Sequence, residues 1–525
     1  MKGGVERRAV ALDSSIENVL IEAGVRAAEQ LKSSRPKLSA ATLNKLTNAI
    51  PLLFGVLAFV AMCTTSGMIA LSVIVVLPTA FRIWVVVHSV ATSSNTNRNL
   101  SSRDESDDEL PMYSVIAALH REAAVVDQLL SAIEQLDYPS EKLDVIVAVE
   151  ADDHGTRAAI TARKHRIPIV VVPVAPAALR TKPKALNVAL PFARGLFTVI
   201  YDAEDRPERN QLRRALQAFR SASSDLACVQ ARLCTDTKMS WLSRYFSAEY
   251  AGHFDIFLPR LAALGLPLPL GGSSNHFRTA TLREVGGWDP HNVTEDADLG
   301  MRLARFGYRS GVIDSTTYEE APTKVGAWLG QRTRWFKGWM QTWLVHMRKP
   351  GHLFRELGCG GFLTFQFVVG GNALVAMAHP AFLFGLSWEL IPPLSTGDHQ
   401  AAVVRLGHYM AVAVLGYCAS ASFGVLGLWQ RGMLNKTRVL ILTPVHWLLL
   451  SLAAWSAALE LMTKPYFWKK TEHGVDKISR QEGRIRALLE LERYLDELKR
   501  AGQLARFGRP RDSAANRRRH PQAAV

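Results

Sequence analysis

Apolar residues in this chain are concentrated in two blocks, which flank a long region of ordinary soluble character. The first block, 48–91, divides into two apolar stretches, each near the ~20 residues that a helix needs to cross ~30 Å of hydrocarbon. The second block, 357–461, contains further apolar stretches at 361–394, 406–429 and 439–461. The pattern predicts a multi-pass membrane protein with one soluble domain inserted between its transmembrane helices.

We expect the first block to form a helical hairpin. We expect the second to cross the membrane four times, because 361–394 contains His379-Pro380 and is long enough for two short helices. Six crossings leave both termini on the side of the soluble domain. The region 464–525 carries 16 Lys and Arg against 8 Asp and Glu, and such basic segments mark the cytoplasmic face. The short basic loop 430–438 argues for the opposite orientation.

Between the two blocks the apolar runs become short and alternate with amphipathic stretches. The short runs predict buried strands at 113–119, 143–149, 167–172 and 196–201. The stretches between them predict helices at 122–136, 155–165 and 184–193. This alternation is typical of βαβ units with a mainly parallel sheet covered on both faces. Ligands of such sheets bind outside the carboxyl ends of the strands.

Acidic residues follow two of the predicted strands. The second strand ends in Glu150-Ala-Asp152-Asp153 and the fourth in Asp202-Ala-Glu204-Asp205. One such cluster can be a solvated turn, but two at equivalent strand ends favour a site. Carboxylates grouped in this way repel one another unless a cation is bound, and hard oxygen ligands suit Mg²⁺ or Mn²⁺. Between them Lys182-Pro-Lys-Ala-Leu-Asn187 opens a predicted helix, where a lysine and the helix N-terminus can meet phosphate.

A third acidic segment and an aromatic helix lie further along the chain. Thr294-Glu295-Asp296 can be explained as a helix start, since Thr caps helices and acids suit the first turn. The stretch 328–343 carries four tryptophans at helical spacing together with Gln331 and Arg334. Such a helix beside a membrane span can be simply an interfacial amphipathic helix.

Composition narrows the function class further. With 48% apolar and 21% charged residues, the 525-residue chain is neither disordered nor a small disulfide scaffold. The five cysteines contain no C-x-x-C pair, which indicates reduced thiols and not zinc or disulfide chemistry. The net charge of +15 comes with no aromatic-basic nucleic-acid motif, so no nucleic-acid partner is expected. Neither a Walker A nor a G-x-G-x-x-G motif is present.

Taken together, these residues resemble a membrane-embedded family 2 glycosyltransferase, related to cellulose, chitin and hyaluronan synthases. That family shares a first Asp motif, D-x-D, T-E-D and Q-x-x-R-W, in this order. Here they correspond to Asp152-Asp153, Asp202-Ala-Glu204-Asp205, Thr294-Glu295-Asp296 and Gln331-x-x-Arg334-Trp335. Lys182 and Asn187 resemble the Lys and Asn of the family's nucleotide pocket, and Trp468 and Thr471 its cytoplasmic W-x-x-T-x-x-G-type segment. The resemblance covers roughly residues 110–475, and Glu204 departs from D-x-D.

The resemblance implies a GT-A fold and an inverting, metal-dependent hexosyltransferase that uses a nucleotide-diphospho sugar, with UDP favoured. It implies that Asp152 or Asp153 contacts the base and ribose, and that Asp202 and Glu204 hold the diphosphate through Mg²⁺ or Mn²⁺. Asp296 is the implied general base. The acceptor and diphosphate residues that it implies are Glu295, Gln331, Arg334, Trp335, Trp468 and Thr471.

The chain is accordingly expected to divide into a cytoplasmic extension (1–46), a transmembrane hairpin (47–92), an acidic linker (93–109), the glycosyltransferase domain (110–322), interface helices (323–356), a transmembrane bundle (357–462) and a basic cytoplasmic tail (463–525). The expected location is the inner (plasma) membrane. Three uses of this machinery stay open: elongation of a β-linked polysaccharide with export through envelope partners, a single transfer to a lipid acceptor, and a non-catalytic receptor or transporter.

Overall fold

A computed structural model describes residues 22, 24–62, 64–92, 107–176, 179–236 and 240–468. Most of the predicted acidic linker, Thr471 and the basic tail lie outside the described residues.

The described residues contain one eight-stranded sheet with the order β3-β2-β1-β4-β7-β6-β8-β5. Its first half is parallel, as the βαβ pattern predicts, and consists of β3 (Ile169–Val174), β2 (Leu143–Glu150), β1 (Tyr113–Leu119) and β4 (Phe197–Tyr201). The second half consists of β7 (Asn275–Arg278), β6 (Leu226–Thr235), β8 (Arg309–Glu319) and the short β5 (Arg206–Pro207). Because β7 runs antiparallel to both β4 and β6, the sheet is mixed.

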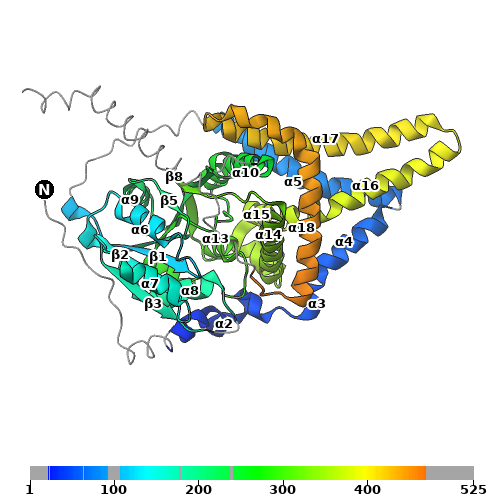
Figure 1. Cartoon of the computed structure of the whole chain (residues 1–525). Helices are drawn as coiled ribbons and strands as arrows, with labels where there is room; N and C mark the ends of the chain where they lie inside the picture. Colours follow the sequence, from blue (N-terminus) through cyan, green and yellow to red (C-terminus); the bar gives the residue numbers. More distant parts are fainter. Residues whose placement is uncertain are drawn as a thin grey trace, which may run out of the picture. The chain divides into compact units, whose positions relative to one another are not determined.

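Helices cover both faces of this sheet (Figure 1). Successive residues of β1 point to opposite sides, so Val115 and Ala117 join one apolar core and Ile116 joins the other. The first core is closed by α6 (Val126–Glu134), α7 (His154–Ala162) and α9 (Gln211–Ser221). The second is closed by α8 (Lys182–Ala189), α11 (Leu258–Ala263), α12 (Thr279–Glu284) and α13 (Glu295–Arg305). Between β6 and α11 lie α10 (Trp241–Ala251) and the π-helix η7 (Gly252–Phe257).

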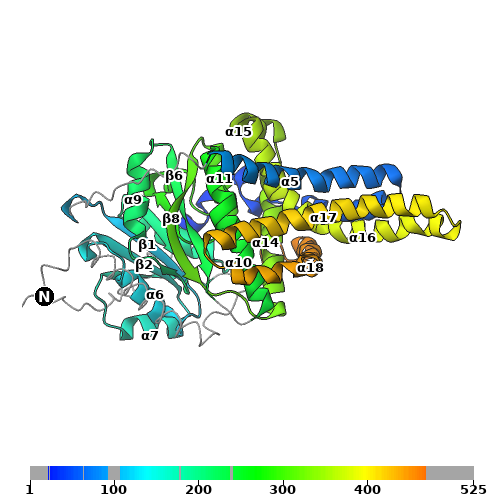
Figure 2. The ribbon, with the colours of Figure 1, turned by 90° about the horizontal axis from the view of Figure 1, so that it is seen from above.

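The apolar blocks form helices, as predicted. They consist of α4 (Ile50–Ala61), α5 (Thr65–Thr92), α15 (Pro350–Thr364), the π-helix η8 (Phe365–Gly370), α16 (Gly371–Ser395), α17 (His399–Gln430), the 3₁₀ segment η9 (Leu434–Leu442) and α18 (Thr443–Thr463). In Figure 2, α5, α16 and α17 run beside one another and away from the sheet. Among the described residues, four stretches are long and apolar enough to cross a membrane: 66–88, 350–392, 399–430 and 434–463.

The two short helices expected within 361–394 are not seen, because α16 continues through His379-Pro380 and 350–392 forms one candidate span. Proline is tolerated there because apolar helices packed in a bundle can accommodate the lost backbone hydrogen bond. The first half of the predicted hairpin belongs to a shorter apolar helix, Lys45–Ala61. The number of membrane crossings stays a prediction.

An N-terminal segment, residues 29–42, lies against the sheet domain, and we call it the strap. Leu31 is fully buried, and Arg35 Nη1 donates to the Glu284 carbonyl at 2.7 Å. The Asp289 carboxylate accepts hydrogen bonds from Ser39 Oγ at 2.9 Å and from the Ala40 backbone N–H at 2.6 Å. The strap thus holds the chain to the domain just before α3 (Lys45–Asn48) and α4.

Candidate active site

The turn after β4 carries three carboxylates. Asp205 closes the turn, because its Oδ2 accepts the Asp202 backbone N–H at 2.7 Å and the Ser273 hydroxyl. Burial raises the pKa of Asp205 well above its ordinary value, and the neighbouring Asp202 and Glu204 raise it further. Asp202 is half-buried and lies at the edge of this turn, where it can meet a ligand.

Lys182, the first residue of α8, is the partner of Asp202. Its Nζ forms an ion pair with Asp202 Oδ1 and donates to the Gly272 carbonyl at 2.5 Å. Burial would lower the pKa of Lys182, but the negative charges of Asp202, Glu295 and Asp205 outweigh burial and raise it. The amine therefore keeps its proton and can neutralise phosphate oxygens at this edge of the sheet.

Glu295 and Asp296 enter the same cluster from the first turn of α13. Asp296 Oδ1 accepts the Ala297 backbone N–H at 2.7 Å, and a Cβ on Gly272 would lie 3.3 Å from Asp296 Oδ2. Burial raises the pKa of Asp296, while the Ala297 hydrogen bond and the charges of Lys182 and Arg334 oppose the rise. Burial and then the charge of Asp296 raise the pKa of Glu295 to about 7.

The helix α14 (Val325–His346) supplies the second cation. Burial lowers the pKa of Arg334, and the charges of Glu295, Asp296 and Asp202 oppose this change. The Arg334 guanidinium carbon lies 5.5 Å from the centroid of the Trp468 ring. The structure thus brings Lys182 and Arg334 together with Asp202, Glu295 and Asp296 in one partly buried cluster, which we call the charged cluster.

Two further residues of the aromatic helix lie differently. Gln331 has a buried Oε1 without a hydrogen-bond donor among the residues that the structure describes. Trp335 packs against the apolar cluster of Leu242 and Phe246, with the Arg332 guanidinium carbon 4.6 Å from its ring centroid. The Q-x-x-R-W motif therefore presents Arg334 to the carboxylates and Trp335 to a neighbouring surface.

The remaining predicted donor residues have other partners. Asp153 caps α7 by accepting the Thr156 backbone N–H at 3.1 Å, and its second oxygen accepts the Arg121 N–H at 2.5 Å. Asp152 is exposed and pairs with Arg180 at 2.8 Å. Asn187 donates to the Trp288 carbonyl at 2.7 Å and accepts the Trp288 N–H at 2.9 Å, so both ends of its amide hold that loop.

Sequence reasoning missed one acid of this region, Glu319 at the end of β8. Burial raises the pKa of Glu319 well above its ordinary value, with Asp205 and Glu204 adding to the rise. The signal was available, because the β-branched pair Thr316-Thr317 and the aromatic Tyr318 precede Glu319-Glu320. It is the same pattern of a strand followed by acids that identified the other two clusters.

The residues near Asp202 fit a divalent cation shared with a ligand. Among the described positions, no three His, Cys, Asp or Glu side chains form a complete ligand set. Mg²⁺ and Mn²⁺, however, commonly take one or two carboxylates together with phosphate oxygens. A bound cation would relieve two features of this turn. Asp202, Glu204 and Asp205 repel one another, and the buried Asp205 Oδ1 lacks a hydrogen-bond partner within the described chain.

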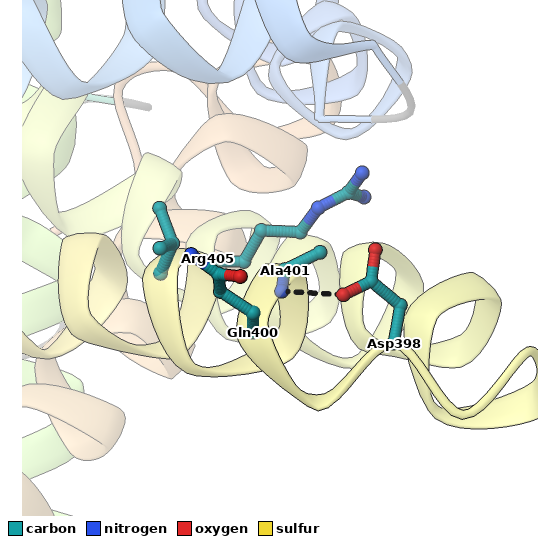
Figure 3. Close-up of a pocket in the computed structure, with 5 residues that line it drawn as sticks. Asp398, Gln400, Ala401 and Arg405 are labelled. Carbon is teal, nitrogen blue, oxygen red and sulfur yellow. Dashed lines mark hydrogen bonds between the residues drawn. The ribbon is translucent and has the colours of Figure 1, made fainter.

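A surface hollow at the start of α17 lies outside this region of the chain (Figure 3). It is lined by Asp398, Gln400, Ala401, Val404 and Arg405. Asp398 Oδ1 accepts the Ala401 N–H at 3.0 Å, which is an ordinary helix cap. No member of the charged cluster lines this hollow, and we do not regard it as the reaction site.

The family model for glycosyl transferase family group 2 matches residues 197–463, half of the chain. The chain belongs to this family. Its mixed sheet is GT-A-like, and as a family member it transfers sugar from a nucleotide sugar. The predicted family 2 glycosyltransferase is thereby confirmed, while the nearer kinship with cellulose, chitin and hyaluronan synthases stays a prediction.

Similar proteins include a β-monoglucosyldiacylglycerol synthase of Synechocystis, 26% identical over 71% of this chain and 78% of that protein. The probable glycosyltransferase YdaM of Bacillus subtilis is 25% identical over 56% of this chain and 71% of its own length. Among solved structures, a mannosyltransferase of Pyrobaculum calidifontis in complex with GDP-Man and Mn²⁺ covers 69% of this chain and 99% of its own, with 20% identity and a TM-score of 0.46.

Proposed function

We propose that this glycosyltransferase inverts the anomeric centre and uses the charged cluster as its reaction site. The observation that carries the proposal is the convergence of Lys182, Asp202, Asp296 and Arg334 from four separate elements. Two cations next to three carboxylates suit a reaction that binds a diphosphate and also removes a proton.

In this proposal Asp296 accepts the proton of an acceptor hydroxyl. The hydroxyl oxygen forms a bond to the anomeric carbon while the bond from that carbon to the diphosphate breaks, and the nucleoside diphosphate leaves. Attack from the opposite face inverts the centre, so an α-linked donor gives a β-linked product. Lys182 and Arg334 bind the diphosphate oxygens, and their fixed charges stabilise the leaving group.

We assign the metal to Asp202 and Glu204. When bound, Mg²⁺ or Mn²⁺ would supply Lewis-acid neutralisation of the departing diphosphate. Asp205 is less suited as a ligand, since its Oδ2 already accepts two hydrogen bonds that close the turn after β4.

The acceptor in this proposal is a membrane lipid that receives one sugar. Support comes from the Synechocystis relative, which is named for the synthesis of a glucosylated diacylglycerol and aligns over most of this chain. The four apolar candidate spans that accompany the charged cluster also suit an acceptor drawn from a bilayer. We place the enzyme in the inner (plasma) membrane with its sheet domain in the cytoplasm, on the support of the basic tail.

Elongation of a β-linked polysaccharide is the second candidate. A probable glucomannan 4-β-mannosyltransferase of Arabidopsis thaliana is 24% identical over 48% of this chain, so a polymer-forming relative is also similar. A polymer would need a route across the membrane, and the helices α16, α17 and α18 would supply it.

Product length decides between the two acceptors. Purified full-length protein in lipid vesicles is incubated with radiolabelled UDP-glucose, UDP-N-acetylglucosamine or GDP-mannose, and the product is separated by size and by solvent extraction. We expect one labelled sugar in the lipid phase. Macromolecular, water-soluble product would support the polysaccharide candidate, and the absence of transfer and of donor hydrolysis with every donor would contradict the proposed reaction.

A further inference from the structure

The face of α14 opposite to Arg334 carries a second polar group that the reaction does not use. Trp328, Arg332 and Trp335 are spaced so that they share this face. Arg332 Nη2 forms a 2.5 Å ion pair with Glu249 Oε2 of α10. Its guanidinium carbon also lies over the Trp335, Phe246 and Trp328 rings, at 4.6, 5.0 and 5.3 Å from the centroids. A carboxylate, a guanidinium and a tryptophan face are thus held together.

Several nitrogen atoms around this ion pair lack partners. The Trp328 Nε1 atom, the Arg332 Nε atom and both ring nitrogens of His446 are buried and make no hydrogen bond within the described residues. His446 Nε2 lies 3.7 Å from Glu249 Oε2. Buried N–H groups are normally satisfied, so the N–H groups of Trp328 and Arg332, and the one that a neutral His446 ring carries, are open to oxygen atoms of a bound molecule. The Glu249 side chain remains 27% exposed, which leaves it open to such a molecule.

The group lies next to the charged cluster. Tyr250 follows Glu249 in α10, and its hydroxyl donates a hydrogen bond to Glu319, whose pKa is raised by Asp205 and Glu204. Tyr250 and Trp335 pack against the same apolar cluster. A molecule bound at Glu249 and Arg332 would therefore lie beside Tyr250, one hydrogen-bonded residue away from the carboxylates of the turn after β4.

The group also borders the membrane helices. His446 belongs to α18, which is part of the candidate span 434–463, and α10 packs against α17. Arg82 of α5 donates a hydrogen bond to Asn372 of α16, and its positive charge acts on Glu249. An acceptor whose chains lie among these helices could place its headgroup at this point.

We propose that Glu249, Arg332 and Trp335 bind the headgroup of the acceptor, and that this acceptor is an uncharged, hydroxyl-bearing membrane lipid. The inference rests on the proposed function. The Glu249 carboxylate accepts hydrogen bonds from headgroup hydroxyls, Arg332 donates to hydroxyl or ester oxygens, and the Trp335 face packs on C–H groups. Because the charges of Glu249 and Arg332 cancel, an anionic phosphate headgroup would meet an unfavourable carboxylate.

The test compares Glu249→Gln with wild-type protein in phosphatidylcholine vesicles. The probes are dioleoylglycerol and its monoglucosylated form as uncharged acceptors, and phosphatidylglycerol and phosphatidic acid as anionic ones. Hydrolysis of the radiolabelled donor by water reports the donor site independently of any lipid. Glu356→Gln is the matched control, since Glu356 forms a comparable 2.7 Å ion pair with Arg305 and is 32% exposed.

We expect wild-type protein to use an uncharged lipid in preference to the anionic ones. Glu249→Gln should raise the KM for that lipid about tenfold or more, with donor hydrolysis and thermal unfolding within twofold and two degrees of wild type. Glu356→Gln should leave both activities unchanged. Four results would each overturn the inference. In Glu249→Gln these are an unchanged KM or a parallel loss of lipid transfer and hydrolysis. In wild-type protein they are a preference for anionic lipid or donor hydrolysis with no lipid transfer. Absence of both sugar transfer and donor hydrolysis in the wild type, with every donor, would instead contradict the proposed function.

Discussion

Glu295 and Asp296 are neighbours in the chain, but their environments give Glu295 the stronger hold on a proton. The pKa of Glu295 is raised to about 7 by burial and by the charge of Asp296. Asp296 gains a backbone hydrogen bond from Ala297 that favours its ionised form. Two carboxylates whose environments push their pKa values apart can divide the roles of acid and base. We infer that Glu295 holds the proton when both compete for one, which leaves Asp296 ionised as the base.

The raised pKa of Glu295 predicts a pH-dependent stability. The folded protein binds this proton more tightly than the unfolded chain, so stability falls as pH rises from the ordinary value of 4.5 to about 7. We expect Glu295→Gln to remove this loss and to be more stable than wild type at pH 8, by about 1–3 kcal/mol. Thermal unfolding of both proteins at pH 5 and pH 8 measures it. The expected advantage shrinks at pH 5, and an advantage that grows at low pH would contradict the assignment.

Asp202 and Glu204 predict a requirement for a divalent cation. Exhaustive dialysis against EDTA should lower sugar transfer about tenfold or more, because the carboxylates and the diphosphate would then repel one another. Addition of Mg²⁺ or Mn²⁺ should restore transfer, and the control is wild-type protein dialysed without chelator. Full activity of the chelated protein would remove the metal from the proposed reaction.

Single residues also show where sequence reasoning reaches its limit. Lys182, Asp202, Asp296 and Arg334 were identified from motifs, and the structure brings them into one cluster. Asn187 was identified in the same way, but its amide is engaged by Trp288, a partner distant in the chain. The capping role of Asp153 was readable from Thr156 three residues later. The Arg332–Glu249 pair was not readable, because its members are 83 positions apart and belong to no shared motif.

At the scale of elements, α14 fixes the start of α13 by close approach. A Cβ on Gly338 would lie 2.3 Å from Thr294 Oγ1 and 2.6 Å from the Thr294 backbone nitrogen. Thr294 directly precedes Glu295 and Asp296, so a shift there displaces both carboxylates. The helix that carries Arg334 and the helix that carries Asp296 thus approach most closely at this glycine, and a larger residue there would move them apart.

Gly338→Ala should therefore lose both stability and transfer. Overpacking at such a contact costs about 1–3 kcal/mol. The control is Gly326→Ala in the same helix, where nothing lies within 4 Å of the added Cβ. That variant should be neutral or slightly stabilised, since alanine is the better helix former. Thermal unfolding and transfer rate are measured for both, and equal behaviour of the two variants would contradict the close approach.

Elements were predictable where the local pattern decides them. The four parallel strands followed from short apolar runs, because strands buried on both faces must be apolar throughout. The antiparallel β7 was missed, since three of its four residues, Asn275-His-Phe-Arg278, are polar and it is a strand only through its pairing with β4 and β6. The continuous helix through Pro380 was missed as well, because this breaker in water is accommodated inside α16.

At the scale of the whole described chain, the strap connects the sheet domain to the segment that follows α18. Asp289 binds Ser39 and Ala40, and the Tyr466 hydroxyl donates to the Ala40 carbonyl at 3.2 Å. Arg348 Nη1 donates to the Lys37 carbonyl at 2.9 Å. Tyr466 lies two residues before Trp468, which packs on Arg334, so the strap also steadies an aromatic neighbour of the charged cluster.

Asp289→Asn should loosen the strap. The amide cannot accept both hydrogen bonds as a carboxylate does, and we expect trypsin to cleave after Lys37 about tenfold faster than in wild type. Asp225→Asn is the control, because Asp225 pairs with Arg309 and does not contact the strap. Mass spectrometry of timed digests gives the rate at this bond. Equal rates in Asp289→Asn and wild type would mean that the strap is held by other contacts.

The most direct test of the proposed reaction is the Asp296→Asn variant, which keeps the shape of the side chain and removes its basicity. We expect this protein to bind nucleotide-sugar donor with a Kd within about threefold of wild type and to transfer sugar at least about 100-fold more slowly. Transfer at the wild-type rate, with donor binding intact, would contradict the assignment of Asp296 as the base and of the charged cluster as the place where the sugar is transferred.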